Sequence, residues 1–171
     1  KALSAIAEKN PDNGYGAMAS FLKMQQEYQE ASRYDPQTSS PSLRFALVNI
    51  AKELSTITNR YNATAAAAMS ANLLSSIESK EMGMETEKVN IPDMPFLSKV
   101  SYRNLQKIYY RIIQLTDEDF TRQNFADSSW EKITRRPSLR TISQELPDPG
   151  DKRLHSVEIK IDALSAGQYA I

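Results

Sequence analysis

His155 and a run of three acidic residues, Asp117, Glu118 and Asp119, are the side chains best suited to acid–base chemistry at neutral pH. The three acids could also serve as Ca²⁺ ligands. Thr116, however, precedes Asp119 by three residues, a spacing typical of a helix cap, where acidic residues stabilise the first turn. His155 begins a segment of alternating polarity, and no serine or aspartate is spaced to form a catalytic arrangement with it. We therefore interpret the acids as a capped turn and His155 as a partly buried strand residue.

The numbers of soft ligands and glycines exclude most cofactor chemistry. The chain has no cysteine and one histidine, too few for a zinc, haem or iron–sulfur site, and a cysteine nucleophile is excluded. The five glycines are scattered and form no phosphate-binding loop. They are Gly14, Gly16, Gly83, Gly150 and Gly167. We expect no metal, no cofactor and no enzymatic activity.

A basic cluster lies close to the single tryptophan. It consists of Lys132, Arg135, Arg136 and Arg140, beside Trp130. Such a cluster could contact phosphate or stack a base. The chain as a whole has 21 Lys+Arg against 21 Asp+Glu, so it has no net charge to attract nucleic acid. We expect a solvated face, or ion pairs with the acidic turn, and no nucleic-acid partner.

The first half of the chain has the periodicity of helices, and these elements must position any site there. Residues 2–9 and about 15–33 are predicted helices, separated by the turn-forming residues 10–14. A further helix is predicted from apolar residues that recur at spacings of four and three, as in a core seam. These are Leu43, Leu47, Ile50, Leu54, Ile57 and Tyr61. Residues 43–82 hold no helix breaker, so one long helix and two helices joined near residues 59–62 both remain open.

Two other patterns in the helical half are open to a functional interpretation. Methionines and a tyrosine at helical spacing could line a ligand groove, although such spacing is more often that of a core. They are Met18, Met24, Tyr28 and Met69. Residues 62–64, Asn-Ala-Thr, match an N-glycosylation acceptor, which we interpret as incidental because we expect it inside a helix.

The second half of the chain has the periodicity of strands. Residues 83–98 are expected to hold the boundary, with Gly83 and the proline-containing stretch 90–95 as a linker. Polar and apolar residues alternate at 107–112 and again, strictly, at 155–161 after a turn at 147–151. A weaker strand is predicted at 139–146, and a short helical or irregular cover at Trp130 and Ile133. We therefore predict a helical domain over 1–90 and a β domain over 97–171.

Leu164, Gly167 and Tyr169 follow the strictly alternating strand with the spacing L-x-x-G-x-Y. In β-sandwich domains this spacing is typical of a tyrosine corner, in which the chain turns at Gly and the Tyr hydroxyl hydrogen-bonds back across the bend. The leucine would close the end of the core. An ordinary hairpin with a buried tyrosine is the alternative. Either way the three residues form a structural motif.

The β half resembles the first macroglobulin-type β-sandwich of bacterial alpha-2-macroglobulin-like proteins, especially those of the Bacteroidetes type. The segments that carry the resemblance are 105–115, Trp130, 146–148, Asp151, 155–161 and 164–169. The resemblance implies a large exported chain of repeated sandwich modules, in the periplasm or at the cell surface, that binds or entraps proteases. The family's thioester requires a cysteine, so no thioester residue can be placed in this chain.

A sandwich of this type has about seven strands, and Tyr169 would begin the sixth. We therefore expect a partial sandwich in a piece of a longer protein, with an open sheet edge that pairs with a further segment or another chain. No stretch approaches the roughly 20 apolar residues that cross a bilayer, so no membrane span is expected.

Taken together, the sequence predicts an α+β protein with an N-terminal helical bundle and a partial antiparallel Ig-like β-sandwich. Its expected function is that of a non-catalytic structural and protein-interaction module of an exported alpha-2-macroglobulin-like protein. Its partners would be neighbouring modules of the parent chain or proteases. Two alternatives remain open: a module that binds a glycan or small ligand, and an accessory domain of an exported hydrolase.

Overall fold

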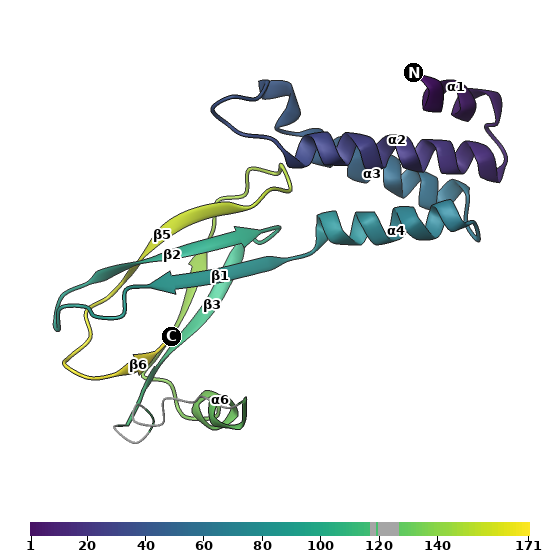
Figure 1. Ribbon diagram of the computed structural model, residues 1–171. Helices are drawn as coiled ribbons and strands as arrows, with labels where there is room; N and C mark the ends of the chain where they lie inside the picture. The colour runs from purple at the N-terminus through teal and green to yellow at the C-terminus, as the bar shows by residue number, and fades with distance from the viewer. Residues whose placement is uncertain (117–118, 120–126) are drawn as a thin grey trace. The chain divides into compact units, whose positions relative to one another are not determined.

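The computed structural model describes residues 1–116, 119 and 127–171, and it has the predicted α+β fold (Figure 1). Its helices are α1 (Ala2–Lys9), α2 (Gly14–Ser32), the 3₁₀ helix η1 (Pro41–Leu43), α3 (Ala46–Arg60), α4 (Ala65–Glu78) and α6 (Asp127–Thr134). Its strands are β1 (Glu81–Thr86), β2 (Phe96–Arg103), β3 (Lys107–Gln114), β4 (Arg140–Glu145), β5 (His155–Ile161) and β6 (Tyr169–Ala170).

The chain divides into two compact units. The helical unit consists of Lys1–Glu81 together with Pro149–Leu154, and the β unit consists of Met82–Asp148 together with His155–Ile171. This division differs from the predicted domains 1–90 and 97–171 at two places. Residues 81–86 form a strand where a linker was expected, and residues 149–154 belong to the helices although they directly precede β5.

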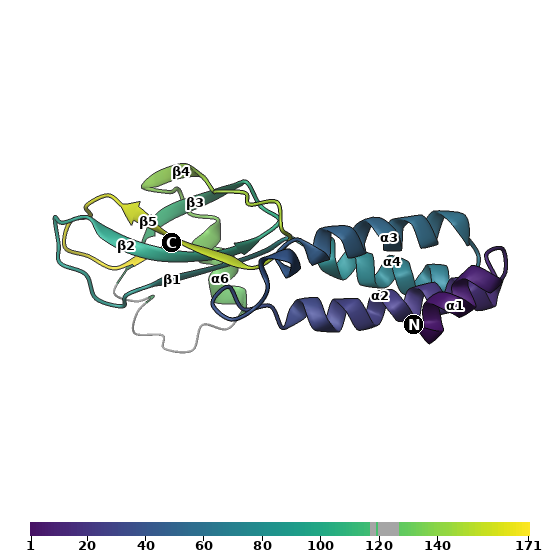
Figure 2. The same ribbon diagram turned by 90° about the horizontal axis from the view of Figure 1, so that it is seen from above.

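In the helical unit, α2, α3 and α4 contact one another, and α1 packs on α2 (Figure 2). The middle of the predicted seam, from Leu47 to Ile57, lies in α3 and is buried, with Leu54 fully inaccessible to solvent. The two end members lie outside α3 and are partly buried: Leu43 belongs to η1, and Tyr61 follows the helix. Burial of one leucine side chain contributes about 1.5–3 kcal/mol, so this seam is the main source of stability for α3. The buried members of this core are Ala17, Phe21, Met24, Ala31, Leu47, Ile50, Ala51, Leu54, Ile57, Ala66 and Ile77.

Within residues 43–82 the structure has two helices, α3 and α4, with a turn between them. Thr64 caps α4, because its side-chain oxygen accepts a hydrogen bond from the Ala67 amide (3.2 Å). Ala63, just before this cap, has a φ of 65°, which a continuous helix does not allow. Asn13 caps α2 in the same way as Thr64 caps α4.

Gly16 allows the turn between α1 and α2 to lie against the first turn of α2. A Cβ atom at Gly16 would be 1.8 Å from the backbone oxygen of Asn10, which is far inside van der Waals contact. Only glycine therefore fits this position of α2 without moving the turn.

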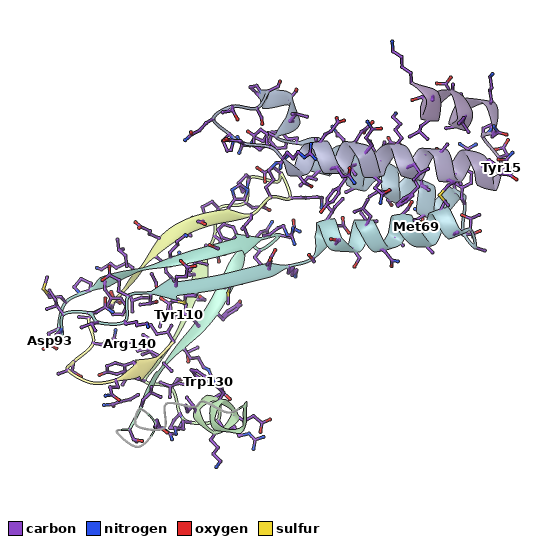
Figure 3. The ribbon with its side chains drawn as sticks, in the orientation of Figure 1. Tyr15, Met69, Asp93, Tyr110, Trp130 and Arg140 are labelled. Atoms are coloured by element: carbon purple, nitrogen blue, oxygen red, sulfur yellow. The ribbon has the colours of Figure 1, made fainter. Side chains whose placement is uncertain are left out.

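The β unit contains two three-stranded antiparallel sheets, with strand orders β1-β2-β5 and β4-β3-β6. In the first sheet Val100 lies opposite Val157, and in the second Tyr110 lies opposite Ile142. Both sheets contribute to one core, against which Tyr110 packs partly buried (Figure 3). Its buried members are Val100, Tyr102, Ile108, Ile112, Leu146, Ile159, Ile161 and Leu164. Among the residues that the structure describes, β6 pairs with Ile113 and Gln114 of β3.

Strands β1 and β2 were not predicted. Gly83, which lies within β1, was expected in the linker, and a serine interrupts the alternation of β2. Ser98 lies on the inward face with Phe96, Val100 and Tyr102, and it is fully buried. Its hydroxyl forms a hydrogen bond with the Thr86 hydroxyl, which satisfies the buried polar group. In the sequence, a polar residue at an inward position indicates a break in the hydrophobic pattern. In the structure this residue has a hydrogen-bond partner, Thr86, in the neighbouring strand.

Within residues 1–116, 119 and 127–171, no helix combines the length and the apolar character needed to cross a membrane.

Candidate functional site

The residues of the predicted corner lie together at one end of the β unit. The Tyr169 hydroxyl donates a hydrogen bond to the Ser165 carbonyl (3.1 Å), across the bend that contains Gly167. A Cβ atom at Gly167 would be 3.0 Å from that hydroxyl, so the tyrosine packs over the glycine. Leu164 is buried in the β core, and its carbonyl accepts a hydrogen bond from the Asp93 amide (2.8 Å). This arrangement fixes the chain between β5 and β6.

The acidic turn and the basic cluster are joined by an ion pair. Asp119 accepts hydrogen bonds from both terminal nitrogens of Arg136, at 2.6 and 2.8 Å, and from the amide and hydroxyl of Thr116. The Arg136 guanidinium, followed by the Thr116 donors, lowers the pKa of the Asp119 carboxyl well below its ordinary value. Asp117 and Glu118 lie outside the described residues.

Other members of the basic cluster also contact the chain itself. Arg140 donates to the carbonyls of Asp162 and Ala163, and Arg135 lies 3.7 Å from a Glu131 carboxylate oxygen. Trp130 lies on α6 and is partly exposed (Figure 3). Arg136 and Arg140 thus contact groups of the β unit itself, and the Arg135–Glu131 pair is exposed and contributes little.

His155 is half-buried at the start of β5, directly opposite Tyr102. The centres of the two rings are 6.1 Å apart, with planes tilted by 45°. Tyr102 is itself buried and donates to the Pro147 carbonyl (2.6 Å). The imidazole thus packs beside an aromatic residue of β2.

The Asn62 acceptor motif lies in the turn between α3 and α4, and not inside a helix as expected. Asn62 is exposed, while the Thr64 hydroxyl donates to the Tyr61 carbonyl (2.7 Å). The residues weighed as a Met/Tyr groove do not form one surface. Met24 is buried in the helical core, and Met18 and Tyr28 pack against this core. Met69 is exposed on α4 (Figure 3).

A groove that the sequence did not indicate lies between α3 and α4 in the helical unit. Its volume is about 400 Å³, within the range of about 300–1,000 Å³ typical of ligand sites. Apolar side chains of Val48, Ala51 and Leu74 line it together with polar ones. The polar lining residues are Lys52, Ser55, Thr56, Asn59, Glu78 and Lys152.

Lys152 reaches the groove from the loop of residues 149–154, and Arg153 anchors this loop. The Arg153 guanidinium donates hydrogen bonds to three backbone carbonyls, those of Ala31 (2.9 Å), Leu43 (2.7 Å) and Arg44 (2.9 Å). It also stacks over the Tyr34 ring, 4.3 Å from the ring centre. Partial burial lowers the pKa of Arg153, an effect that the nearby Asp151 opposes.

Asp151 lies buried in the same loop and fixes its conformation through hydrogen bonds. Only 2% of its side chain is exposed, and one carboxylate oxygen accepts a hydrogen bond from the Arg153 amide (3.1 Å). The other oxygen accepts from Nε of Arg44 (3.3 Å). A buried carboxylate with charged and amide donors stabilises one loop conformation, because its removal would leave those donors without partners. Arg153 and Asp151 therefore hold Lys152 at the groove.

Comparison of the chain with family models, curated proteins and solved structures finds no match.

Proposed function

We propose that the chain is a non-catalytic protein-interaction module, and that the groove between α3 and α4 holds a segment of the partner protein. The observation that carries this proposal is the combination of apolar and polar lining residues with a lysine that an anchored loop places among them. Such a groove binds by shape and by a few placed polar groups, and its loop needs no rearrangement to present Lys152.

Selection from a displayed random-peptide library tests this proposal. Ser55→Trp would fill the groove, since Ser55 lines it and is half-buried. Glu53→Trp places the same bulk on an exposed position of α3 outside the groove. We expect selected peptides to lose binding to Ser55→Trp and to keep it with Glu53→Trp, with both variants retaining the helical circular dichroism of the unchanged protein. Peptides that bind both variants equally would contradict the proposal.

For the β unit, we propose a macroglobulin-type, partial Ig-like sandwich that belongs to a large exported alpha-2-macroglobulin-like protein. Two observations support it: two antiparallel sheets share one core, and the Tyr169 hydroxyl bonds back to the Ser165 carbonyl. In this setting the β unit would be a rigid link between modules, and proteases would be candidate partners. The full-length gene tests this proposal, which predicts an export signal and further sandwich repeats.

A small ligand is the second candidate for the groove, because a volume of about 400 Å³ also suits a glycan or small molecule. Thermal-shift screening with glycans distinguishes the two. Stabilisation by a glycan that Ser55→Trp abolishes would favour this candidate, and no stabilisation by any glycan would count against it.

A further inference from the structure

Lys152 is held at the groove in a strained backbone conformation. Its φ is 58°, in the left-handed region that non-glycine residues rarely adopt, and Gly150 two residues earlier has a φ of 69°. Such a conformation persists only where the surroundings impose it, and it is commonly found at binding sites. Here Asp151 and Arg153 impose it through the contacts described above. The strained backbone therefore places the Lys152 side chain in the lining of the groove.

The contact with Glu78 indicates that Lys152 pairs with a carboxylate. The Lys152 ammonium lies 3.3 Å from a Glu78 carboxylate oxygen. The Glu78 side chain is 53% exposed, whereas that of Lys152 is 25% exposed. Ion pairs of such exposure contribute little to stability, so a carboxylate from outside can exchange with Glu78 at small cost.

The rest of the groove favours an acidic segment with apolar neighbours. Lys52 and Lys152 outweigh Glu78, which leaves one net positive charge among the lining residues. Val48, Ala51 and Leu74 offer an apolar surface beside these charges. An acidic segment with apolar neighbours can therefore contact both kinds of lining residue at once.

We propose that the partner segment is acidic, and that one of its carboxylates replaces Glu78 as the partner of Lys152. This inference rests on the proposed function and specifies the chemistry of the occupant. It makes Glu78 a competitor of the ligand: while the groove is empty Glu78 pairs with Lys152, and on binding it turns to solvent.

A short blocked peptide of alternating leucine and glutamate is a suitable probe, with the matching leucine–glutamine peptide as its control. Binding to the full chain is measured by fluorescence anisotropy of the labelled peptides at low and high salt. We expect Lys152→Gln to weaken binding of the glutamate peptide about tenfold, as for loss of one charge-assisted hydrogen bond. Lys80→Gln, at an exposed lysine outside the groove, should leave binding unchanged.

Glu78 provides a test in the opposite direction. Glu78→Gln removes the competitor, so we expect it to strengthen binding several-fold, whereas Glu53→Gln should have no effect. Lys152→Gly removes both the charge and the backbone strain. This variant should therefore weaken binding while it raises the midpoint of urea unfolding, which distinguishes a binding role of Lys152 from a stabilising one.

Three outcomes would overturn the inference. Equal binding of the glutamate and glutamine peptides, both lost in Ser55→Trp, would contradict the acidic segment and leave the proposed function intact. Stronger binding of free glutarate than of the peptide would assign the groove to a small acid. No binding of either peptide, together with no groove-dependent peptide from the library, would contradict both proposals.

Discussion

Replacement of Arg153 by leucine should destabilise the helical unit selectively. The guanidinium donates to three carbonyls, and the bonds to Ala31 and Leu43 are partly buried. A hydrogen bond to a charged group contributes about 1.5–3 kcal/mol, so the lower value for these two bonds gives a loss of about 3 kcal/mol in the free energy of unfolding. The third bond, to Arg44, is exposed and is left out of this sum.

Two signals separate the units in this experiment. Trp130, the only tryptophan, lies in the β unit, so its fluorescence reports on that unit during urea unfolding. Far-ultraviolet circular dichroism is dominated by the helices of the other unit. We expect Arg153→Leu to move the dichroism transition to lower urea and to leave the fluorescence transition nearly in place.

Two further variants sharpen the result. Arg153→Lys keeps the charge but not the fork of donors, so it should recover only part of the loss. Arg33→Leu removes an exposed arginine at the end of α2 and should change the transition little. The reasoning would be refuted if Arg153→Leu and Arg33→Leu had the same effect, or if both signals moved equally in Arg153→Leu.

Three other predictions concern stability. Ser70→Ala should raise the stability of the helical unit by about 1 kcal/mol, measured by urea unfolding, because the Ser70 hydroxyl is fully buried and without a hydrogen-bond partner among the described residues. Gly16→Ala should lower the midpoint of the dichroism transition, since its Cβ would be 1.8 Å from a backbone oxygen of the α1–α2 turn; Gly14→Ala, with open space around it, should raise the midpoint. Arg136 lowers the pKa of Asp119, so this pair stabilises the β unit above the unfolded-state pKa of about 3.9, and the contribution is lost as the pH falls below about 4. Acid unfolding followed by Trp130 fluorescence should therefore be less steep in Asp119→Asn, and an unchanged profile would count against the pair.

The helices could be predicted well because their signals are local. The seam of α3 and the turn residues before α2 each lie within one stretch of sequence. The structure gives α2 nearly the expected bounds, and α3 contains the seam residues from Leu47 to Ile57. The break at residues 61–64 could not be decided, because Ala63 has no preference for its left-handed φ of 65°. It is the cap by Thr64 and the packing of α4 that require this conformation.

The strands were predicted where the alternation is uninterrupted, as in β5, and missed where a polar residue faces inward, as at Ser98. The candidate groove could not be predicted at all. Its lysine comes from residue 152, and the anchoring bond of Arg153 spans 122 residues to Ala31. No local sequence pattern indicates a contact between residues so far apart in the chain. The Pro-Gly-Asp turn at residues 149–151 indicates a bend, but not the carbonyls against which the next residues pack.

The helical unit is assembled from two separate stretches of the chain, and this limits how the protein can be divided. A fragment that stops at residue 90 would keep all of α1 to α4 yet lack Arg153, so the carbonyls of Ala31 and Leu43 would lose this donor. Such a fragment should be less stable than the same helices in the intact chain. Supplying residues 149–154 as a separate peptide should restore part of the lost stability, because the peptide brings back the guanidinium of Arg153.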